Sequence, residues 1–336
     1  MMADSTALVV TSIAAPNAIL RSLSIGCQTH GWWFIVVGDS KSPDDFYLDG
    51  CDYYSLDRQR SMDLLYANLC PKAHYARKNI GYLIAIRRGA SIIVDTDDDN
   101  VPGDEFWLAR QPLCIFPTVK KKGWVNVYRY FTDMNVWPRG LPLRYIRAET
   151  PPWESLTKQT HYCPIQQGLA NQDPDTDAVY RLVQYAPVVF QQGRSVTLEE
   201  NVWCPFNSQN TVWWKDAFEL LYLPATCSFR MTDIWRSFVA QRIAWANGWR
   251  ISFYSPTVLQ ERNEHDLMRD FVDEVPGYIH NEHICSTLEN LMIKPGVDFI
   301  GDNLIACYEA LVKIGVVATE EIPLLRAWIE DARRFI

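Results

Sequence analysis

The segment Asp95–Asn100 contains the side chains of this sequence that are best suited to bind a metal ion. It reads Asp-Thr-Asp-Asp-Asp-Asn, so four carboxylates fall within six positions. Like charges this close together repel one another strongly unless a cation neutralises them. Carboxylate oxygens are hard ligands that suit Mg²⁺ or Mn²⁺. A solvated acidic turn is the simpler alternative, but the apolar strand predicted directly before the segment argues against it.

Two better-known acidic motifs do not fit this segment. An EF-hand loop that began at Asp95 would need Gly at its sixth position and Glu at its twelfth, where Asn100 and Phe106 stand. A phosphatase nucleophile of the Asp-x-Asp-x-Thr type would need Thr or Val at the fifth position, which is Asp99, and would follow the first strand. What remains is a DxD-type site, in which two carboxylates hold a cation that bridges the phosphates of a nucleotide-sugar.

The composition is that of a folded globular protein. The chain has 336 residues, of which 48% are hydrophobic and 21% charged, and its net charge of −8 argues against a non-specific nucleic-acid binder. Nine cysteines without a CxxC pair indicate buried free thiols in a reducing compartment. Met1–Thr6 has no basic residue, and Ala7–Val10 is too short for a signal peptide or a membrane span. We therefore expect a soluble, cytoplasmic protein.

Apolar strands and helices alternate over the first hundred residues. The predicted strands are Ala7–Ser12, Trp32–Val37 and Ala90–Val94, and the predicted helices are Asn17–Leu23, Leu64–Leu69 and Tyr75–Arg88. This alternation indicates a parallel sheet with helices on both faces. Ligands of such sheets bind beyond the carboxyl ends of the strands. Thr11, Asp39 and the acidic segment would all lie there.

The rest of the chain is expected to shape a substrate pocket and then to form a helical extension. Residues 101–215 are rich in Pro, Trp and Tyr, which predicts ordered loops with short strands. A helix at Ile234–Asn247 and a strand at Ile251–Tyr254, closed by Ser255 and Pro256, follow. Four further helices are predicted, at Asp266–Glu274, Glu282–Met292, Asp302–Ile314 and Thr319–Phe335. We therefore expect a catalytic domain over residues 1–262 and a C-terminal helical extension packed on it over residues 263–336.

Five blocks resemble successive segments of the STELLO glycosyltransferase-like domain, in the same order and at similar spacing. They are Gly38–Lys41, Tyr75–Tyr82 with Asp95–Asn100, Asn171–Arg181, Pro205–Thr211 and Phe229–Arg236. More distantly, the chain is similar to the reversibly glycosylated polypeptides, the UDP-arabinopyranose mutases. The resemblance implies a glycosyltransferase A fold, an α/β architecture with a Rossmann-like mixed sheet and helices on both faces. It also implies a nucleotide-sugar donor, most often a UDP-sugar, and Mn²⁺ or Mg²⁺.

The resemblance assigns roles within the acidic segment. Asp97 and Asp99 match the outer members of the family's triple-Asp motif and are expected to bind the metal. Asp98 is expected to face the sugar or ribose, and Asp95 is an extra acid that could orient the site from behind. His265 is a candidate third metal ligand, because enzymes of this fold often draw one from this late region. A lone His is nevertheless more often an ordinary core or surface residue.

Basic and amide side chains in the other blocks are candidates for binding the donor. Arg77 and Lys78 could neutralise the diphosphate, or they could form a solvated helix face. Gln209 and Asn210 could bind sugar hydroxyls, although buried amides that tie loops together would look the same.

Residues after the strand ends are candidates of a second kind. Thr11 and Asp39 lie where a base or ribose would be bound, and Asp39 would equally suit a turn. Asp173, Asp175 and Asp177 could bind hydroxyl groups of donor or acceptor, or form an acidic turn.

Arg139 and Asp233 are the candidate catalytic residues. Arg139 aligns with the arginine that becomes glycosylated in the reversibly glycosylated polypeptides, so it is expected to line the anomeric carbon, unless it is an ordinary turn residue. Asp233 could be a general base or could orient the acceptor, and it would also suit a helix N-cap. Trp203 or Trp235 could stack on a sugar or base.

These residues favour a metal-dependent glycosyltransferase that moves a sugar from a nucleotide donor, most often UDP-linked, to an acceptor such as a glycan. A nucleotide-sugar mutase, which would depend on Arg139, and a catalytically silent scaffold for glycan synthesis are the alternatives. Asp97, Asp99, Arg77 and Asp233 argue against a silent scaffold, since such a protein has no reason to keep all four chemical types.

Overall fold

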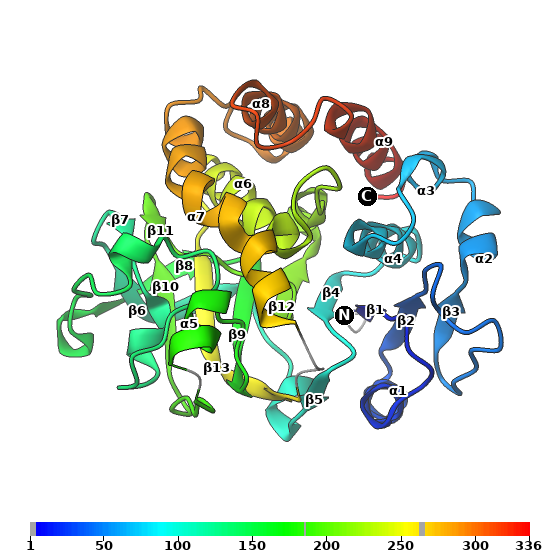
Figure 1. Cartoon of the computed structure of the whole chain (residues 1–336), viewed down its shortest axis with the longest axis horizontal. Coiled ribbons are helices and arrows are strands. Elements are labelled where there is room, and N and C mark those ends of the chain that lie inside the picture. Colours follow the sequence, from blue (N-terminus) through cyan, green and yellow to red (C-terminus); the bar gives the residue numbers. More distant parts are fainter. Residues whose placement is uncertain (1–4, 185, 262–265) are drawn as a thin grey trace.

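A large mixed β-sheet runs through the molecule (Figure 1). The computed structural model describes residues 5–184, 186–261 and 266–336. The strands in this part of the chain are β1 (Thr6–Thr11), β2 (Trp33–Val37), β3 (Asp52–Tyr54), β4 (Ile92–Thr96), β5 (Asn100–Pro102), β6 (Leu113–Val119), β7 (Gly123–Trp124), β8 (Thr157–Tyr162), β9 (Ile165–Gln172), β10 (Ser195–Leu198), β11 (Val202–Trp203), β12 (Asn210–Trp214) and β13 (Ile251–Gln260). Their order in the main sheet is β3-β2-β1-β4-β12-β9-β13-β10-β6-β8, with β5 paired to β13 and β7 paired to β11 in a separate ribbon.

The directions of the central strands create the edge at which ligands of such folds bind. Strands β3, β2, β1 and β4 are parallel to one another. Strand β12 is antiparallel to both β4 and β9, and β13 is parallel to β9. The carboxyl ends of β1, β2, β4, β9 and β13 therefore meet the start of β12 at one edge of the sheet. This arrangement confirms the mixed α/β sheet expected for the glycosyltransferase A type.

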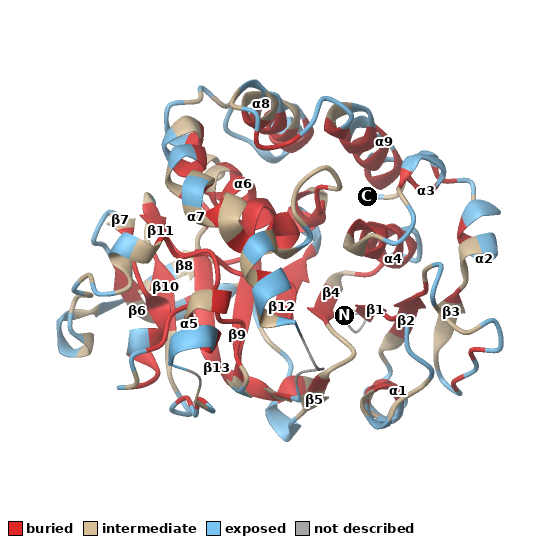
Figure 2. Cartoon of the chain, viewed as in Figure 1, coloured by how far each residue is buried: buried red, intermediate tan, exposed pale blue. Residues whose placement is uncertain are grey.

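Helices cover both faces of the parallel half of the sheet. The helices are α1 (Ala18–His30), α2 (Leu56–Arg60), α3 (Leu65–Leu69), α4 (Lys78–Arg87), α5 (Ala178–Val183), α6 (Thr232–Ala246), α7 (Leu267–Glu289), α8 (Ile300–Lys313) and α9 (Glu321–Arg333). In Figure 1, α1 lies on one side of β1 and β2 and α4 on the other. Because side chains alternate along a strand, β1 sends Leu8 and Val10 to the α1 face and Val9 to the α4 face. All three are fully buried, and Figure 2 shows that the neighbouring central strands are buried as well.

Gly81 allows α4 to lie directly on the sheet. A Cβ atom at this position would come within 2.6 Å of Val9 and 2.8 Å of Val37. Such distances are closer than packed carbon atoms tolerate, so a larger residue would push the helix away from β1 and β2. The close approach matters for the site because α4 begins with Lys78, which reaches the end of β4.

Two predictions for the second half of the chain were wrong. Strand β13 continues to Gln260 instead of closing at Ser255 and Pro256, and its register shifts between Tyr254 and Val258. A shift of this kind accommodates a proline, which cannot donate to the ladder. The two helices predicted at Asp266–Glu274 and Glu282–Met292 are one helix, α7, which passes through Pro276.

Packing explains why α7 continues through its proline. It lies against α5 and α6 and against the turn Phe229–Met231. Gly277, next to the proline, has Met231 where its own Cβ would be. Tertiary contacts therefore outweigh the local preference for a break.

The remaining C-terminal helices pack on the rest of the protein. Helix α8 contacts α6 and α9, and α9 contacts α3 and α4. The boundary predicted between residues 262 and 263 lies outside the described residues. None of the described helices combines the length and the apolar character that a bilayer crossing needs. The nine cysteines are free thiols, most of them buried.

Candidate functional site

A pocket of about 420 Å³ opens at the carboxyl-end edge of the sheet. This volume lies within the range of small-molecule sites. Most of the predicted site residues line it, namely Thr11, Asp39, Arg77, Asp97, Asp98, Asp99, Arg139, Gln209 and Asp233. Lys78 and Asn210 are instead buried in the protein beside it, and His265 lies outside the described residues.

The acidic segment forms one wall of the pocket. Asp97, which follows β4, keeps 29% of its side chain exposed, and its Oδ1 accepts hydrogen bonds from the Tyr75 hydroxyl at 2.8 Å and from Lys78 at 2.9 Å. Asp99 Oδ2 accepts from the amide of Gln260 at 3.0 Å. Both carboxylates therefore face the pocket from a fixed position, one from each end of the Asp97–Asp99 turn.

Asp98 is turned toward the start of α1. Its Oδ2 accepts a hydrogen bond of 2.5 Å from Ser12 Oγ, and its backbone carbonyl accepts from Asn17. Burial raises the pKa of Asp98, and the Ser12 hydroxyl opposes that rise. Asp98 thus ties the acidic turn to the loop after β1 while still lining the pocket.

Behind the acidic wall lies a buried set of ion pairs. Lys78 Nζ is 2.7 Å from Asp95 Oδ1, and Arg236 Nη1 is 3.1 Å from Asp95 Oδ2. Lys78 and Asp95 have no exposed side-chain surface. Burial disfavours the ammonium, but Asp95 and Asp97 more than offset it and raise the pKa of Lys78. Lys78 is therefore a permanent internal cation that holds the acidic segment together, with Asp95 as its main partner.

The geometry supplies part of a divalent-metal site. Among the residues that the structure describes, no three His, Cys, Asp or Glu side chains are grouped so that they could hold a metal ion. Mg²⁺ is usually bound by one or two carboxylates together with water and substrate phosphates, and Mn²⁺ accepts the same oxygen ligands. Asp97 and Asp99, which both line the pocket, fit that donor set.

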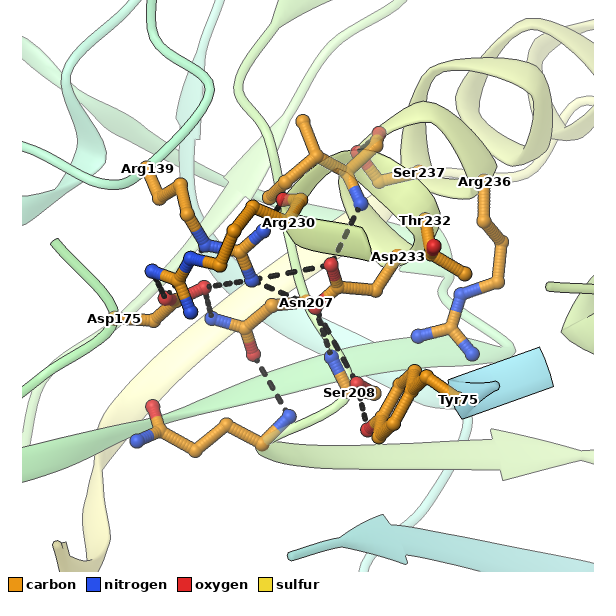
Figure 3. A network of polar contacts seen from close by, with 12 residues as sticks. Tyr75, Arg139, Asp175, Asn207, Ser208, Arg230, Thr232, Asp233, Arg236 and Ser237 are labelled. Carbon is orange, nitrogen blue, oxygen red and sulfur yellow. Dashed lines mark hydrogen bonds and ion pairs between the residues drawn. The ribbon is translucent and has the colours of Figure 1, made fainter. Parts of the chain in front are cut away.

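A second charged cluster forms another wall of the same pocket (Figure 3). Arg139 binds Asp175 through Nε and Nη2, each at 2.8 Å, and its Nη2 also lies 2.9 Å from Asp233 Oδ2. All three side chains are at least nine-tenths buried. Asp233, in the first turn of α6, also accepts a hydrogen bond from the backbone N–H of Ser208 at 3.3 Å, and Ser208 Oγ lies at the same distance from Asp233 Oδ2. The cluster fixes the Asp233 carboxylate at the pocket wall.

Helix α7 supports this cluster from outside the pocket. Glu274 Oε1 lies 2.9 Å from Nη2 of Arg230, a pocket-lining residue. Glu274 Oε2 accepts from the backbone N–H of Ala178 at the start of α5. One carboxylate on α7 therefore ties together the segments that carry Arg230 and the Asp175 turn.

Arg77 and Asp39 hold the loops that form one end of the pocket. Arg77 donates to the side chain of Gln59 and to two backbone carbonyls, and only 2% of the residue is exposed. Asp39 accepts from the backbone N–H groups of Ala73 and His74, both at 2.9 Å. The hydrogen bonds of both side chains therefore stabilise the protein's own loops.

The two predicted amides also bind the protein itself. Gln209 donates to Gln260 at 2.5 Å, and Asn210 donates to the Leu169 carbonyl at 3.0 Å and to Thr257 Oγ1 at 2.9 Å. Asn210 pairs with Thr96 across β12 and β4. These contacts match the alternative interpretation, in which buried amides tie loops together, and Gln209 additionally lines the pocket.

The structure also brings residues to the pocket that the sequence did not single out. Tyr75, His74, Phe229 and Arg230 line it. Phe229 is 54% exposed and lies edge-on to the Tyr75 ring, whereas Trp203 and Trp235, the aromatic residues expected to stack, are buried in the core. All four residues belong to the quoted sequence blocks or stand next to them, so their place in those blocks was the available signal.

Comparison with known proteins identifies the family. The model of the STELLO glycosyltransferases matches residues 230–335. The chain is 31% identical over 277 residues to the probable glycosyltransferase STELLO2 of Arabidopsis thaliana, covering 75% of the chain and 35% of that protein. It is 26% identical over 350 aligned positions to the probable glycosyltransferase STELLO1 of the same plant, covering 96% of the chain and 44% of that protein.

The chain thus spans less than half the length of these curated relatives. Among solved structures, the crystal structure of a mycobacterial protein aligns with 83% of the chain and 74% of its own, at a TM-score of 0.42 and 10% identity, which is too distant to carry an argument. The family model and the two plant relatives agree with each other. The chain belongs to the STELLO glycosyltransferase family.

Proposed function

We propose that this chain binds a UDP-sugar with a divalent cation and transfers the sugar to a hydroxyl group of a glycan acceptor. The observation that carries the proposal is the placement of two charged walls on one pocket. Asp97 and Asp99 lie on one wall, and Asp233, held by Arg139, lies on the other. A donor whose diphosphate meets the first wall would present its sugar to the second.

The residues would divide the chemistry as follows. Asp97 and Asp99 would hold Mn²⁺ or Mg²⁺, which would neutralise the charge that develops on the departing diphosphate. Asp233 would accept the proton of the acceptor hydroxyl while the hydroxyl oxygen forms its bond to the anomeric carbon. The bond from that carbon to the diphosphate would break, and UDP would leave with the electron pair. Arg139 and Ser208 would keep the Asp233 carboxylate in position.

The state of Arg139 favours transfer over ring interconversion through a glycosylated arginine. Burial disfavours its charge, but Asp175 and Asp233 more than offset burial and raise the pKa of Arg139. Its Nε and both Nη atoms donate hydrogen bonds, to Asp175, to Asp233 and to the backbone carbonyl of Arg230. A nucleophilic arginine would have to lose a proton and these partners first. An orienting role for Arg139 requires neither.

Calorimetry of UDP binding tests the proposal. We expect UDP and UDP-sugars to bind at least about tenfold more tightly with Mn²⁺ than without it, a difference of about 1.4 kcal/mol. The double substitution Asp97→Ala/Asp99→Ala should remove that difference. The matched control is Asp104→Ala/Glu105→Ala, which removes two nearby exposed carboxylates that do not line this pocket.

Two results would contradict the proposal. One is equal UDP affinity with and without Mn²⁺. The other is an unchanged metal effect in the Asp97→Ala/Asp99→Ala protein. Metal-dependent UDP binding without hydrolysis or transfer of any UDP-sugar would instead identify a silent scaffold that keeps its ligand.

A further inference from the structure

A chain of hydroxyl contacts joins the two walls of the pocket. Tyr75 OH lies 2.8 Å from Asp97 Oδ1 and 2.6 Å from Ser208 Oγ. Ser208 Oγ in turn lies 3.3 Å from Asp233 Oδ2 (Figure 3). Tyr75 and Ser208 are 133 positions apart in the sequence, and the fold brings them together at the start of β12 and the turn before α4. The path runs from the proposed cation end to the proposed acceptor end.

The number of hydrogens restricts how these contacts can be made. There are three oxygen–oxygen contacts but only two hydroxyl hydrogens, because an ionised carboxylate can only accept. The 2.6 Å contact between Tyr75 and Ser208 must contain a hydrogen, since two bare oxygens at that distance repel each other. Only two arrangements remain. Either both hydroxyls donate toward Asp97, or both donate toward Asp233.

The distances favour donation toward Asp97 in the free protein. The 2.8 Å contact to Asp97 is an ordinary length for a hydroxyl donor, and the 3.3 Å contact from Ser208 to Asp233 is long. Lys78 also donates to Tyr75 OH, at 3.0 Å, and can do so in either arrangement. The change from one arrangement to the other requires two hydroxyl rotations and no change of ionisation.

We infer that Tyr75 and Ser208 are positioning residues whose hydroxyl hydrogens turn together, from Asp97 toward Asp233, when a cation binds Asp97. A cation on this carboxylate repels the hydrogen that Tyr75 donates to it. Tyr75 then donates to Ser208, and Ser208 donates to Asp233. Asp233 therefore gains a further donor only after the cation is in place. The inference rests on the proposed function, because Asp97 must be the residue that meets the cation.

A double-mutant cycle tests the coupling without any need for turnover. The probe is UDP affinity measured in saturating Mn²⁺. Asp233→Asn removes the charged acceptor at the far end of the path, so it should weaken Mn²⁺-dependent UDP binding in the otherwise unchanged protein. In the Tyr75→Phe background the path is broken. The loss of UDP affinity caused by Asp233→Asn should then be smaller by about threefold or more than in the otherwise unchanged protein. Ser208→Ala should give the same result, and it replaces Tyr75→Phe if that protein does not fold.

Asp175→Asn is the matched control, because Asp175 binds the same arginine as Asp233 from its other side. Its effect on UDP affinity should be the same with and without the Tyr75 hydroxyl. Equal effects of Asp233→Asn in both backgrounds, alongside metal-dependent UDP binding by the unchanged protein, would overturn the coupling alone. An unchanged protein that binds UDP without any metal effect would overturn the proposed function, and the coupling would lose its trigger with it.

Discussion

Nη2 of Arg139 lies 2.9 Å from Oδ2 of Asp233, and the same nitrogen lies 2.8 Å from Asp175. A planar guanidinium can bind two carboxylates at once, whereas an ammonium is a single point charge. Arg139 therefore fixes both the position of the Asp233 carboxylate and the distance between Asp233 and Asp175.

Replacement of Arg139 by Lys should consequently impair turnover more than donor binding. We expect Arg139→Lys to lower kcat about 100-fold, because Asp233 is no longer held in place, with a smaller loss of UDP affinity. Arg139→Met should in addition destabilise the protein by about 3–5 kcal/mol, since it removes the cation that two buried carboxylates share. Donor turnover assays and urea unfolding measure the two effects. Equal stability of the Lys and Met variants would contradict this account.

The internal cation Lys78 should be more important for stability than for ligand contact. Lys78→Met leaves Asp95 buried with Arg236 as its one remaining cation among the described residues, and a cost of about 3–5 kcal/mol in unfolding free energy is expected. The double variant Lys78→Met/Asp95→Asn removes the stranded charge and should recover part of that loss. Urea unfolding of both proteins at one pH gives the comparison. Asp95→Asn alone is measured as well. If the loss of unfolding free energy in the double variant equals the sum of the losses in Lys78→Met and Asp95→Asn, the two residues are not coupled as the distances indicate.

His74 should contribute a hydrogen-bond donor to the nucleotide. Its Nδ1 accepts from the backbone N–H of Ala76 at 3.0 Å, so the neutral ring carries its hydrogen on Nε2. Burial lowers the pKa of His74, although Asp39 opposes this, which favours the neutral ring. We expect His74→Phe to weaken UDP binding by about 5- to 30-fold, the value of one hydrogen bond, and His74→Gln to weaken it less. Unchanged affinity of the Phe variant by calorimetry at pH 7.5 would exclude this contact.

Asp177 should make the protein less stable as the pH rises toward neutrality. Burial raises the pKa of Asp177 from 3.8 to about 7, although the backbone N–H of Tyr180 and the indole of Trp137 oppose the rise. Between about pH 4 and pH 7 the folded state therefore holds a proton that the unfolded state has lost. This contribution to stability is complete below the unfolded pKa and disappears as the pH passes through the folded one.

Urea unfolding at pH 5, 6, 7 and 8 tests the expectation for Asp177. Each unit of pKa shift corresponds to about 1.4 kcal/mol, so the decline should amount to about 2–4 kcal/mol over the window. Asp177→Asn should flatten the curve, while Asp104→Asn, at an exposed position, should leave its slope unchanged. Identical slopes for the Asp177→Asn and unchanged proteins would show that this carboxyl titrates normally.

The parallel half of the fold could be predicted because its signals are local. Strands β1, β2 and β4 are short apolar runs that end in polar residues, and all three were found within two residues of their predicted bounds. The same logic located Asp39 and the acidic segment at one edge of the sheet. β13 and α7 were mispredicted because their prolines are accommodated by partners distant in the sequence, for α7 the turn that carries Met231.

The internal arrangement of the candidate site could not be predicted for the same reason. Lys78 was a candidate for neutralising the diphosphate or for a solvated helix face, but the fold buries its side chain against Asp95. Tyr75 stands in one of the resembling blocks, but nothing near it in the sequence indicated its contact with Ser208, more than a hundred positions away. Side-chain chemistry identified which groups matter, and only the fold decides which of them meet.

The pairing of Glu274 with Arg230 has a consequence for exchanging parts between relatives. Because α7 also holds the start of α5 through Glu274, the C-terminal helices are not an interchangeable module. A chimera that joined residues 1–262 to the helices of another family member would separate Arg230 from its own Glu274. Segments around residues 139, 175, 230 and 274 should therefore be exchanged together, because a crossover between them separates side chains that hold one cluster.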